Sequence, residues 1–542
     1  MEKNIDTSDI SLIYPQSVLY ADGFNNRAAA GLSQSNCRAL ELDVLIDLKN
    51  SDLGDFFTSD PETIRYRQRT FSDLSDNPQL CDVLRRMVPL LSDIIELRRM
   101  GGDLAAENEG TLYSITEVEL YLSLLEMLSA ELLPLEDKLT SEALKTFCQR
   151  IKTLVESDYY KELNDRLKAL TSRVREIKSV TVGVNLDSRL RPESAGVLSV
   201  NNDYFKSGAA LDRILRLDFK PDDRSTIAKI QPFRKNQAEN EKRALIYAFN
   251  NAICDVFKSD IREWKKTVST YVLENTDFLL RMMPEIEFVT KAAELIVRLR
   301  DRGCVLCYPD IRPVEEKAYS LTGLLNPVIA LKVDTDLVPN DFTFDENGMI
   351  FVITGPNRGG KSVITTAVGL SFVMAQLGLP VTAQSAVISP CDGIFTHFPA
   401  SSEDTVNKGR LGEECARLRE IFDSLTPDSL VLLDESLSST GSYEGSYIAA
   451  ELLSAFSLIG CRGIFSTHLH DLAASVERIN SECIPKGGVR IDNLVAEIAD
   501  GQRSFRILRK MPDGKSYARD IADKYGLSLE ELLKNKSIDA KK

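Results

Sequence analysis

The chain has 542 residues, of which 43% are hydrophobic and 27% charged, an ordinary composition for soluble globular domains. Its 66 Lys and Arg stand against 81 Asp and Glu, so the formal net charge of −15 argues against a protein that coats nucleic acid through bulk charge, although one basic face is compatible with it. No apolar run reaches the roughly 18 residues of a membrane span and no secretory signal begins the sequence, so we expect a cytoplasmic protein with reduced thiols.

The first part of the chain has a helical pattern. Residues 1–34 form a mixed N-terminal segment, and residues 37–49 carry apolar side chains at near-helical spacing. Asp60 and Pro61 resemble a helix start, with Asp as N-cap and Pro at the first helical position. The helical pattern continues through residues 156–178, which predict one long amphipathic helix.

A small β element interrupts these helices. Residues 179–201 have a β-like pattern around a turn-rich centre, which predicts a hairpin, and helical character returns over residues 235–302. Two helical arms around a β element indicate either a rod with a small element at its tip or a plain helical domain with an inserted loop. On either interpretation we place a helical domain at residues 35–312.

The pattern then changes to that of an α/β domain. Short buried strands recur at residues 349–354, 429–434 and 463–467, and helical stretches separate them. This alternation predicts a mixed, mainly parallel sheet with crossover helices. We place the α/β domain at residues 313–535 and a polar tail at residues 536–542.

A phosphate-binding loop follows the first of these strands. The segment from Gly355 to Ser362 matches G-x-x-x-x-G-K-[ST], and a helical run begins at Val363. Glycines let backbone N–H groups turn toward phosphate oxygens, Lys361 can reach the β and γ phosphates, and the Ser362 hydroxyl can ligate Mg²⁺. The nucleotide-binding residues predicted here are Gly355, Pro356, Asn357, Arg358, Gly359, Gly360, Lys361, Ser362 and Val363.

Two acids end the second strand, and a histidine follows the third. Asp434 lies where a carboxylate can hold Mg²⁺, and Glu435 lies where it can orient or deprotonate the attacking water. His468 is the histidine placed to sense a γ-phosphate, whereas we interpret His397 and His470 as structural. The predicted catalytic residues are therefore Glu435, Lys361 and His468, the predicted metal ligands are Ser362 and Asp434, and the predicted cofactors are ATP and Mg²⁺.

In this order and spacing, the motifs ITGPNRGGKS, LVLLDES and FSTH resemble the ATPase domain of the MutS family, a branch of the ABC ATPases. The resemblance implies an ABC-type P-loop ATPase domain preceded by a largely helical core and lever domain with a short clamp-like insertion near residues 179–230. It covers most of residues 35–535, strongly over residues 326–535. Further segments that carry it are 64–68, 338–341, 373–384, 394–396, 516–517 and 521–522, together with Thr440, Tyr443, Glu444 and Gly445.

Membership in that family implies a homodimer with composite ATP sites. Each nucleotide would bind the phosphate loop of one protomer and be completed by the signature segment of the other. ATP binding would be coupled to clamping of the lever arms on DNA. Two further nucleotide contacts are expected from the resemblance, Gln384 at the end of the segment 373–384 and Gly409 in the signature segment.

The sequence departs from the family pattern at several places. We expect the mismatch-reading and connector domains to be lacking, because the pattern begins near the family's core region and residues 1–60 contain no Phe-x-Glu wedge. In the signature segment, 407–414, Gly409 takes the place of a Ser, which removes a hydroxyl contact to the γ-phosphate that Lys408 or Arg410 could replace. The hairpin is short for a full DNA clamp. No nuclease-type extension follows residue 535, so the nuclease-bearing branch of the family is a poor match.

We therefore predict an ATP-hydrolysing, DNA-binding homodimer that serves DNA repair or recombination, with repair proteins as further partners. The alternative is an ATP-driven conformational switch that acts on a protein or ribonucleoprotein partner, and the acidic balance and the absent reader domain favour it. A nucleotide-binding module without hydrolysis is disfavoured by the intact set of Lys361, Ser362, Asp434 and Glu435.

Overall fold

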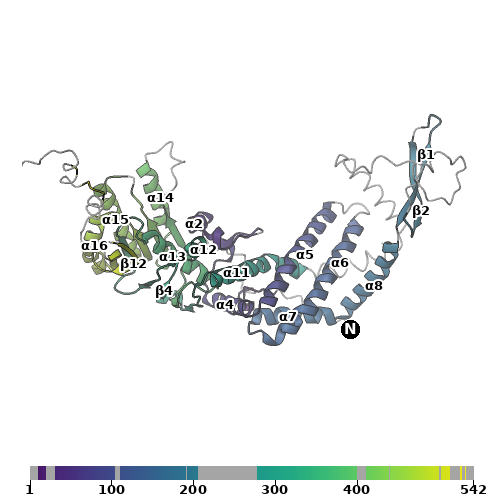
Figure 1. Cartoon of the computed structure of the whole chain (residues 1–542), viewed down its shortest axis with the longest axis horizontal. Coiled ribbons are helices and arrows are strands. Elements are labelled where there is room, and N and C mark those ends of the chain that lie inside the picture. The colour runs from purple at the N-terminus through teal and green to yellow at the C-terminus, as the bar shows by residue number, and fades with distance from the viewer. Residues whose placement is uncertain are drawn as a thin grey trace, which may run out of the picture. The chain divides into compact units, whose positions relative to one another are not determined.

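The computed structural model consists of two compact units (Figure 1). The helical unit comprises Met1–Ile10, Asp82–Leu139 and Leu144–Ile286, and the sheet unit comprises Ser11–Cys81, Thr140–Ala143 and Glu287–Lys542. The residues that the structure describes are 10–19, 31–49, 51–103, 110–176, 178–190, 192–204, 277–398, 410–438, 440–499, 502–512, 525–527 and 532.

Long helices build the helical unit. It contains α5 (Pro78–Asp103), α6 (Gly110–Glu131), η2 (Leu133–Lys138), α7 (Glu142–Glu156) and α8 (Asp158–Glu176), and α5 and α6 lie side by side (Figure 1). An ion pair between Arg98 Nε and Glu117 Oε1, 2.5 Å apart, joins α5 to α6. The buried core draws side chains from each long helix: Leu84, Leu91, Leu124, Leu128, Phe147, Ile151 and Leu163.

The helix predicted over residues 156–178 is confirmed as α8. It is separated from α7 at Ser157, whose Oγ accepts a hydrogen bond from the Tyr160 N–H at 3.2 Å. A serine in this role is a typical N-cap, because its side chain satisfies an N–H that the first helical turn leaves free.

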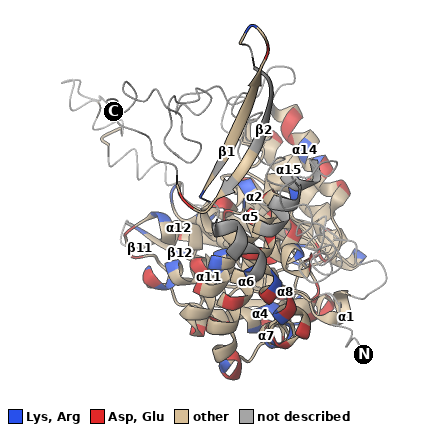
Figure 2. Ribbon diagram, turned by 90° about the vertical axis from the view of Figure 1, so that its right-hand side faces the viewer, with Lys and Arg blue, Asp and Glu red and all other residues tan. Residues whose placement is uncertain are grey.

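The hairpin predicted over residues 179–201 is also confirmed. Its antiparallel strands are β1 (Ser179–Leu186) and β2 (Pro192–Asn201). Figure 2 shows β1 without Lys or Arg, and Val184 and Leu186 on that strand are exposed. The remainder of the predicted insertion, residues 205–230, lies outside the described residues.

Short helices open the sheet unit. The helix predicted over residues 37–49 is wrong in extent, because the chain forms α2 (Gln34–Ala39) and α3 (Leu42–Leu45) with a break at Glu41, whose φ is 53°. The helix start at Asp60 is confirmed: α4 (Pro61–Asp76) has Pro61 in its first turn, and the Asp60 carboxylate accepts the Thr63 N–H at 2.8 Å. Other short elements of this part are α1 (Gln16–Leu19) and η1 (Leu53–Phe56).

A six-stranded sheet forms the centre of the sheet unit. Its strand order is β12-β11-β6-β10-β9-β8, and every pair is parallel except β11 with β12. The mainly parallel sheet expected from the sequence is thus present, and the three predicted strands are β6, β9 and β10. The bounds are β6 (Ile350–Thr354), β8 (Ile394–His397), β9 (Leu430–Asp434), β10 (Arg462–Ser466), β11 (Ile491–Ala499) and β12 (Gln502–Arg509).

Helices cover both faces of this sheet. Val431 and Leu433 of β9 belong to a buried cluster with side chains of α14 (Arg410–Ser424), α15 (Ser442–Ile459) and α16 (His470–Cys483). Leu432 points to the opposite face, because successive side chains of a strand alternate. There it meets α13 (Lys361–Gln376), where a Cβ added to Gly369 would lie 2.6 Å from Leu432 Cδ1. The strands are therefore buried on both sides, which explains their continuous apolar runs.

A second, four-stranded sheet was not expected from the sequence. Its order is β3-β7-β4-β5, with bounds β3 (Asp310–Ile311), β4 (Tyr319–Leu324), β5 (Asn340–Phe344) and β7 (Ser385–Ile388). The remaining described elements are α11 (Met283–Asp301), η4 (Val314–Glu316), α12 (Pro327–Lys332) and η5 (Ile484–Lys486). Among the described residues, no helix is long and apolar enough to cross a membrane.

Candidate functional site: a phosphate loop beside paired acids

The motifs found in the sequence meet at one edge of the six-stranded sheet. Strand β10 lies between β6 and β9, with Ser466 opposite Ile353 on one side and Asp434 on the other. Because these strands are parallel, their carboxyl ends point the same way, and the segments that follow them come together. The phosphate loop, the Asp434–Glu435 pair and His468 therefore share one site.

The backbone of the phosphate loop needs its glycines. Gly355 has φ 138° and Gly360 has φ 95°, values that side-chain-bearing residues rarely adopt. A Cβ on Gly355 would also lie 2.7 Å from the Cβ of Ala496 on β11. Arg358, with φ 58°, takes a left-handed conformation despite its side chain. The loop thus packs tightly on β11 before it turns into α13.

Lys361 is buried at the start of α13, with 4% of its surface exposed. Its Nζ donates to the carbonyl oxygens of Gly355 at 3.1 Å and Pro356 at 3.2 Å. Burial lowers the pKa of this lysine, and the nearby Glu435 and Asp434 oppose that effect. A buried ammonium held only by neutral carbonyls is suited to bind an anion.

Asp434, at the end of β9, is 8% exposed, and its Oδ1 accepts no hydrogen bond. Burial raises the pKa of this carboxyl, and the hydroxyls of Ser466 and Ser362 act in the opposite direction. An unpaired buried carboxylate oxygen is costly unless a cation compensates it. Magnesium prefers oxygen ligands and is commonly held by one or two protein groups plus phosphate oxygens, so Asp434 and Ser362 fit it.

Glu435 has a left-handed backbone, with φ 47°. Its N–H donates to the Ser466 carbonyl at 2.8 Å, and its Oε1 lies 2.9 Å from His468 Nε2. The side chains of Glu435 and His468 are 37% and 38% exposed, so both reach solvent at the mouth of the site. A carboxylate hydrogen-bonded to an imidazole and open to solvent can orient a water molecule.

A buried pair beside Glu435 was missed in the sequence. His397 ends β8 and Ser436 follows Glu435, and His397 Nδ1 lies 2.7 Å from Ser436 Oγ. His397 was interpreted as structural, and no pattern in the sequence links two residues this far apart. His470, interpreted in the same way, is exposed at the first turn of α16.

The segment 338–341, singled out by resemblance, lies close to the loop through β12. Asn340 Nδ2 donates to the Phe505 carbonyl at 3.1 Å, and a Cβ on Gly360 would lie 3.8 Å from that same oxygen. The structure shows no contact between Gln384 and the phosphate loop. Gln384 is exposed before β7, and its side chain lies against Gly323.

Other expected features fall outside the site as the structure describes it. Gly409 and the first part of the signature segment lie outside the described residues, as do residues 516–517 and 521–522. Thr440 and Glu444 are described, and Thr440 Oγ1 donates to Glu444 Oε2 at 2.7 Å.

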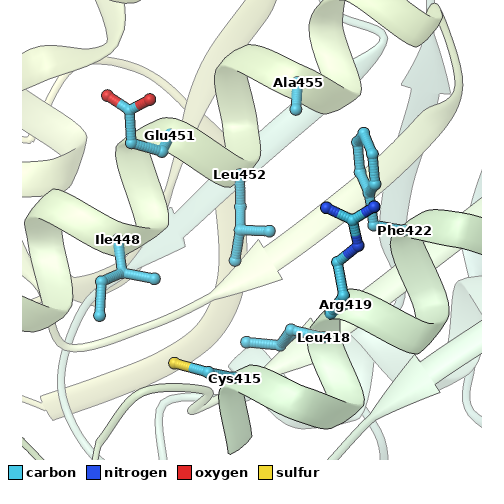
Figure 3. Close-up of a pocket in the computed structure, with 8 residues that line it drawn as sticks. All are labelled: Cys415, Leu418, Arg419, Phe422, Ile448, Glu451, Leu452 and Ala455. Atoms are coloured by element: carbon cyan, nitrogen blue, oxygen red, sulfur yellow. The ribbon is translucent and has the colours of Figure 1, made fainter.

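A mostly apolar groove of about 320 Å³ between α14 and α15 contains no predicted site residue (Figure 3). Its lining is Cys415, Leu418, Arg419, Phe422, Ile448, Glu451, Leu452 and Ala455.

Comparison with protein families gives matches over both the helical and the α/β parts. The family model for MutS domain V matches residues 351–535, and that for the MutS2 N-terminal domain matches residues 59–302. The chain belongs to the MutS family. The MutS domain V match contains the phosphate loop, Asp434, Glu435 and His468.

Curated relatives carry MutS names. "Endonuclease MutS2" of Thermus thermophilus is 32% identical over 223 residues, which are 41% of this chain and 28% of that protein. "DNA mismatch repair protein MutS" of Chlorobium chlorochromatii is 30% identical over 251 residues, 45% of this chain and 28% of that protein. The MutS of Haloquadratum walsbyi is 27% identical over 444 residues, 76% of this chain and 45% of that protein. The chain thus spans less than half the length of these relatives.

The MutS2 match corrects one expectation. The nuclease-bearing branch was expected to be a poor match because no nuclease-type extension was found after residue 535. Over residues 59–302 that expectation is wrong, since the MutS2 N-terminal model matches there. The residues at one end of a chain do not determine how a helical region several hundred residues away is built.

Proposed function

We propose that this MutS-family chain is an ABC-type P-loop ATPase that hydrolyses ATP to ADP and phosphate. The observation that supports this most is the meeting of Lys361, Asp434 and Glu435 at the carboxyl edge of three adjacent parallel strands. A phosphate cradle, a metal-binding carboxylate and a second carboxylate are the parts that in-line phosphoryl transfer to water requires.

Each of these residues has its own role in the proposed reaction, which follows from its position. The loop N–H groups and the N-terminus of α13 bind the phosphates, and Lys361 exchanges its carbonyl partners for the β and γ phosphates. Ser362 and Asp434 would hold Mg²⁺, which would neutralise the charge that develops on the phosphates. Glu435 orients the attacking water, and His468, bonded to Glu435, contacts the γ-phosphate side.

Replacement of Glu435 tests this assignment. Glu435→Gln should bind ATP as the parent does and lose about 100-fold or more of its steady-state phosphate release, because an amide is a poor proton acceptor. Glu451→Gln, an exposed carboxylate on α15 away from the loop, is the control and should keep full turnover. Full turnover in Glu435→Gln would rule out the assigned role.

At the level of the whole protein, we propose a cytoplasmic homodimer with composite ATP sites that engages DNA through lever arms in the helical domain, residues 35–312. The support is family membership together with names of relatives that include DNA mismatch repair proteins and an endonuclease. The ATPase domain is proposed at residues 313–535, and Gln384 and Gly409 as further nucleotide contacts.

A second candidate is an ATP-driven switch that acts on a protein or ribonucleoprotein partner. The net charge of −15 and the absence of Lys and Arg from β1 favour it. Titration of duplex, branched and single-stranded DNA at two salt concentrations, with and without a non-hydrolysable ATP analogue, separates the two. A DNA clamp gives nucleotide-dependent affinity that falls with salt. No binding at low salt would favour the second candidate.

A further inference from the structure

The pair formed by His397 and Ser436 joins the edge strand β8 to the segment that follows the catalytic strand. His397 ends β8, where it lies opposite Leu433 of β9. Ser436 is the residue directly after Glu435. Both side chains are buried, His397 with 4% and Ser436 with 2% of its surface exposed. Neither can therefore exchange its partner for water.

Two hydrogen bonds connect the pair. His397 Nδ1 and Ser436 Oγ lie 2.7 Å apart, and Ser436 Oγ donates to the backbone carbonyl of His397 at 3.3 Å. A serine hydroxyl has one proton. Nδ1 and the carbonyl oxygen of His397 both lie within hydrogen-bonding distance of this one hydroxyl. Ser436 therefore contacts both the ring and the backbone of His397.

The imidazole is neutral near pH 7. Burial lowers the pKa of His397 to about 4, and the positive charge of Arg417 on α14 acts in the same direction. A buried, neutral ring keeps its contact with Ser436 near pH 7, because it carries no charge there that would draw it toward water.

Glu435 needs such a contact. Its φ of 47° is a strained conformation for a side-chain-bearing residue and persists only where surrounding contacts enforce it. On one side, the Glu435 N–H is tied to the Ser466 carbonyl at 2.8 Å. On the other side, the next residue is tied through its hydroxyl to His397. The turn that carries the carboxylate is therefore held at both ends.

We propose that His397 is a positioning residue for ATP hydrolysis, which acts through Ser436 to hold the Glu435 turn against β8. The proposal rests on the proposed ATPase function. His397 and Ser436 do not touch the reacting atoms on this proposal; they fix the backbone that aims the Glu435 carboxylate toward the attacking water.

The test compares full-length variants by steady-state phosphate release. His397→Leu and Ser436→Ala should each lower kcat by about 10- to 100-fold, because small displacements of a catalytic group cost that much, while the KM for ATP stays within about twofold. His397→Asn, whose side-chain amide can donate to or accept from the Ser436 hydroxyl, should recover most of the loss. The double variant His397→Leu/Ser436→Ala should be no slower than the slower single variant, since both changes break the same contact.

A buried serine elsewhere in the sheet unit serves as the structural control. Ser371 of α13 is 2% exposed, and its Oγ lies 2.7 Å from Tyr319 Oη. Ser371→Ala loses a comparable buried hydrogen bond far along the helix from the loop. It should lower the thermal unfolding midpoint to a similar degree as Ser436→Ala and leave kcat unchanged.

The outcomes separate the proposal from the ATPase assignment. If the parent turns over ATP, Glu435→Gln is inactive and the His397→Leu or Ser436→Ala variant keeps parental kcat, the positioning role is wrong and the ATPase assignment stands. Equal losses of kcat in Ser371→Ala and Ser436→Ala, a failure of His397→Asn to recover activity, or additive losses in the double variant would likewise overturn it. Absence of ATP turnover in the parent would overturn both.

Discussion

Lys361 and Asp434 lie in the same site, close enough for their charges to interact, but they form no salt bridge with each other. Lys361 donates to neutral carbonyls, and Asp434 Oδ1 accepts nothing. Burial lowers the pKa of the lysine and raises that of the carboxyl, so in both cases the site disfavours the charged form. A bound phosphate with a magnesium ion would compensate both charges at once. The energetic cost of these two side chains is therefore consistent with a site that is completed by nucleotide.

At the same scale, His397 makes stability depend on pH. Its pKa is about 4 in the folded chain and about 6.5 in the unfolded one, so the unfolded chain binds the proton first as pH falls. The parent should therefore lose about 3 kcal/mol of unfolding free energy, relative to His397→Asn, as pH falls from 6.5 to 4. Denaturant unfolding of the two proteins across this window measures the difference.

The carboxylates titrate in the same window, but they are common to both proteins and cancel in the difference. His470→Asn is the control, because His470 is exposed at the start of α16. This variant should show the same loss of stability between pH 6.5 and 4 as the parent, because its His397 is intact. A parallel pH dependence of the parent and His397→Asn would contradict the buried, neutral imidazole.

At the scale of elements, the end of α13 fixes how the helix behind the phosphate loop is seated. The Gly378 N–H donates to the Ala375 carbonyl at 2.9 Å and the Leu379 N–H to the Met374 carbonyl at 2.8 Å, which is a Schellman motif with Gly378 at φ 86°. A Cβ on Gly378 would lie 2.3 Å from the Cβ of Arg67 on α4. Gly378 therefore both ends α13 and packs against α4.

Gly378→Ala should therefore destabilise the sheet unit strongly. It adds left-handed strain of about 1 kcal/mol to a clash with the buried Arg67, whose cost is about 1–3 kcal/mol. Equilibrium unfolding in denaturant measures the sum. ATP turnover should also fall, because the clash pushes on the helix that carries Lys361.

The chain offers a matched control at the end of α11. There Gly303 has φ 76° in the same motif, with its N–H bonded to the Arg300 carbonyl and the Cys304 N–H to the Leu299 carbonyl. Nothing lies within 4 Å of a Cβ added to Gly303. Gly303→Ala should thus show the backbone strain alone. Equal losses in the two variants would mean that the contact with Arg67 contributes nothing.

At the scale of the whole molecule, the proposed composite site predicts complementation between inactive variants. Lys361→Ala disables the phosphate loop of its protomer, and Gly409→Asp disables the signature segment of its protomer. In a mixed dimer, the intact loop of the Gly409→Asp protomer faces the intact signature segment of the Lys361→Ala protomer, so one of the two sites is intact. Equal mixing should restore about a quarter of the parental turnover, since half the dimers are mixed and each has one working site of two.

Lys361→Ala mixed with Glu435→Gln is the control for this experiment. Both residues belong to the same protomer's half of the site, so no mixed dimer has an intact site and no activity should return. A protein that stays monomeric with ATP bound, by light scattering, would contradict the composite site itself.

The sequence alone determined the parts of the fold and site that are contiguous. The phosphate loop, the Asp434–Glu435 pair and the position of His468 each follow a short buried strand, and apolar runs with local turn signals are read directly from neighbouring residues. The N-cap at Asp60 and the hairpin of β1 and β2 were predicted for the same reason. Local geometry depends on local residues.

Only the tertiary structure decided which distant residues meet. The strand order that inserts β10 between β6 and β9, the bond between Glu435 and His468, and the buried contact of His397 with Ser436 all join segments far apart in the chain. The four-stranded sheet and the break at Glu41 were missed likewise. Packing in the folded core selects such pairings, and no periodicity along a single segment encodes its partner.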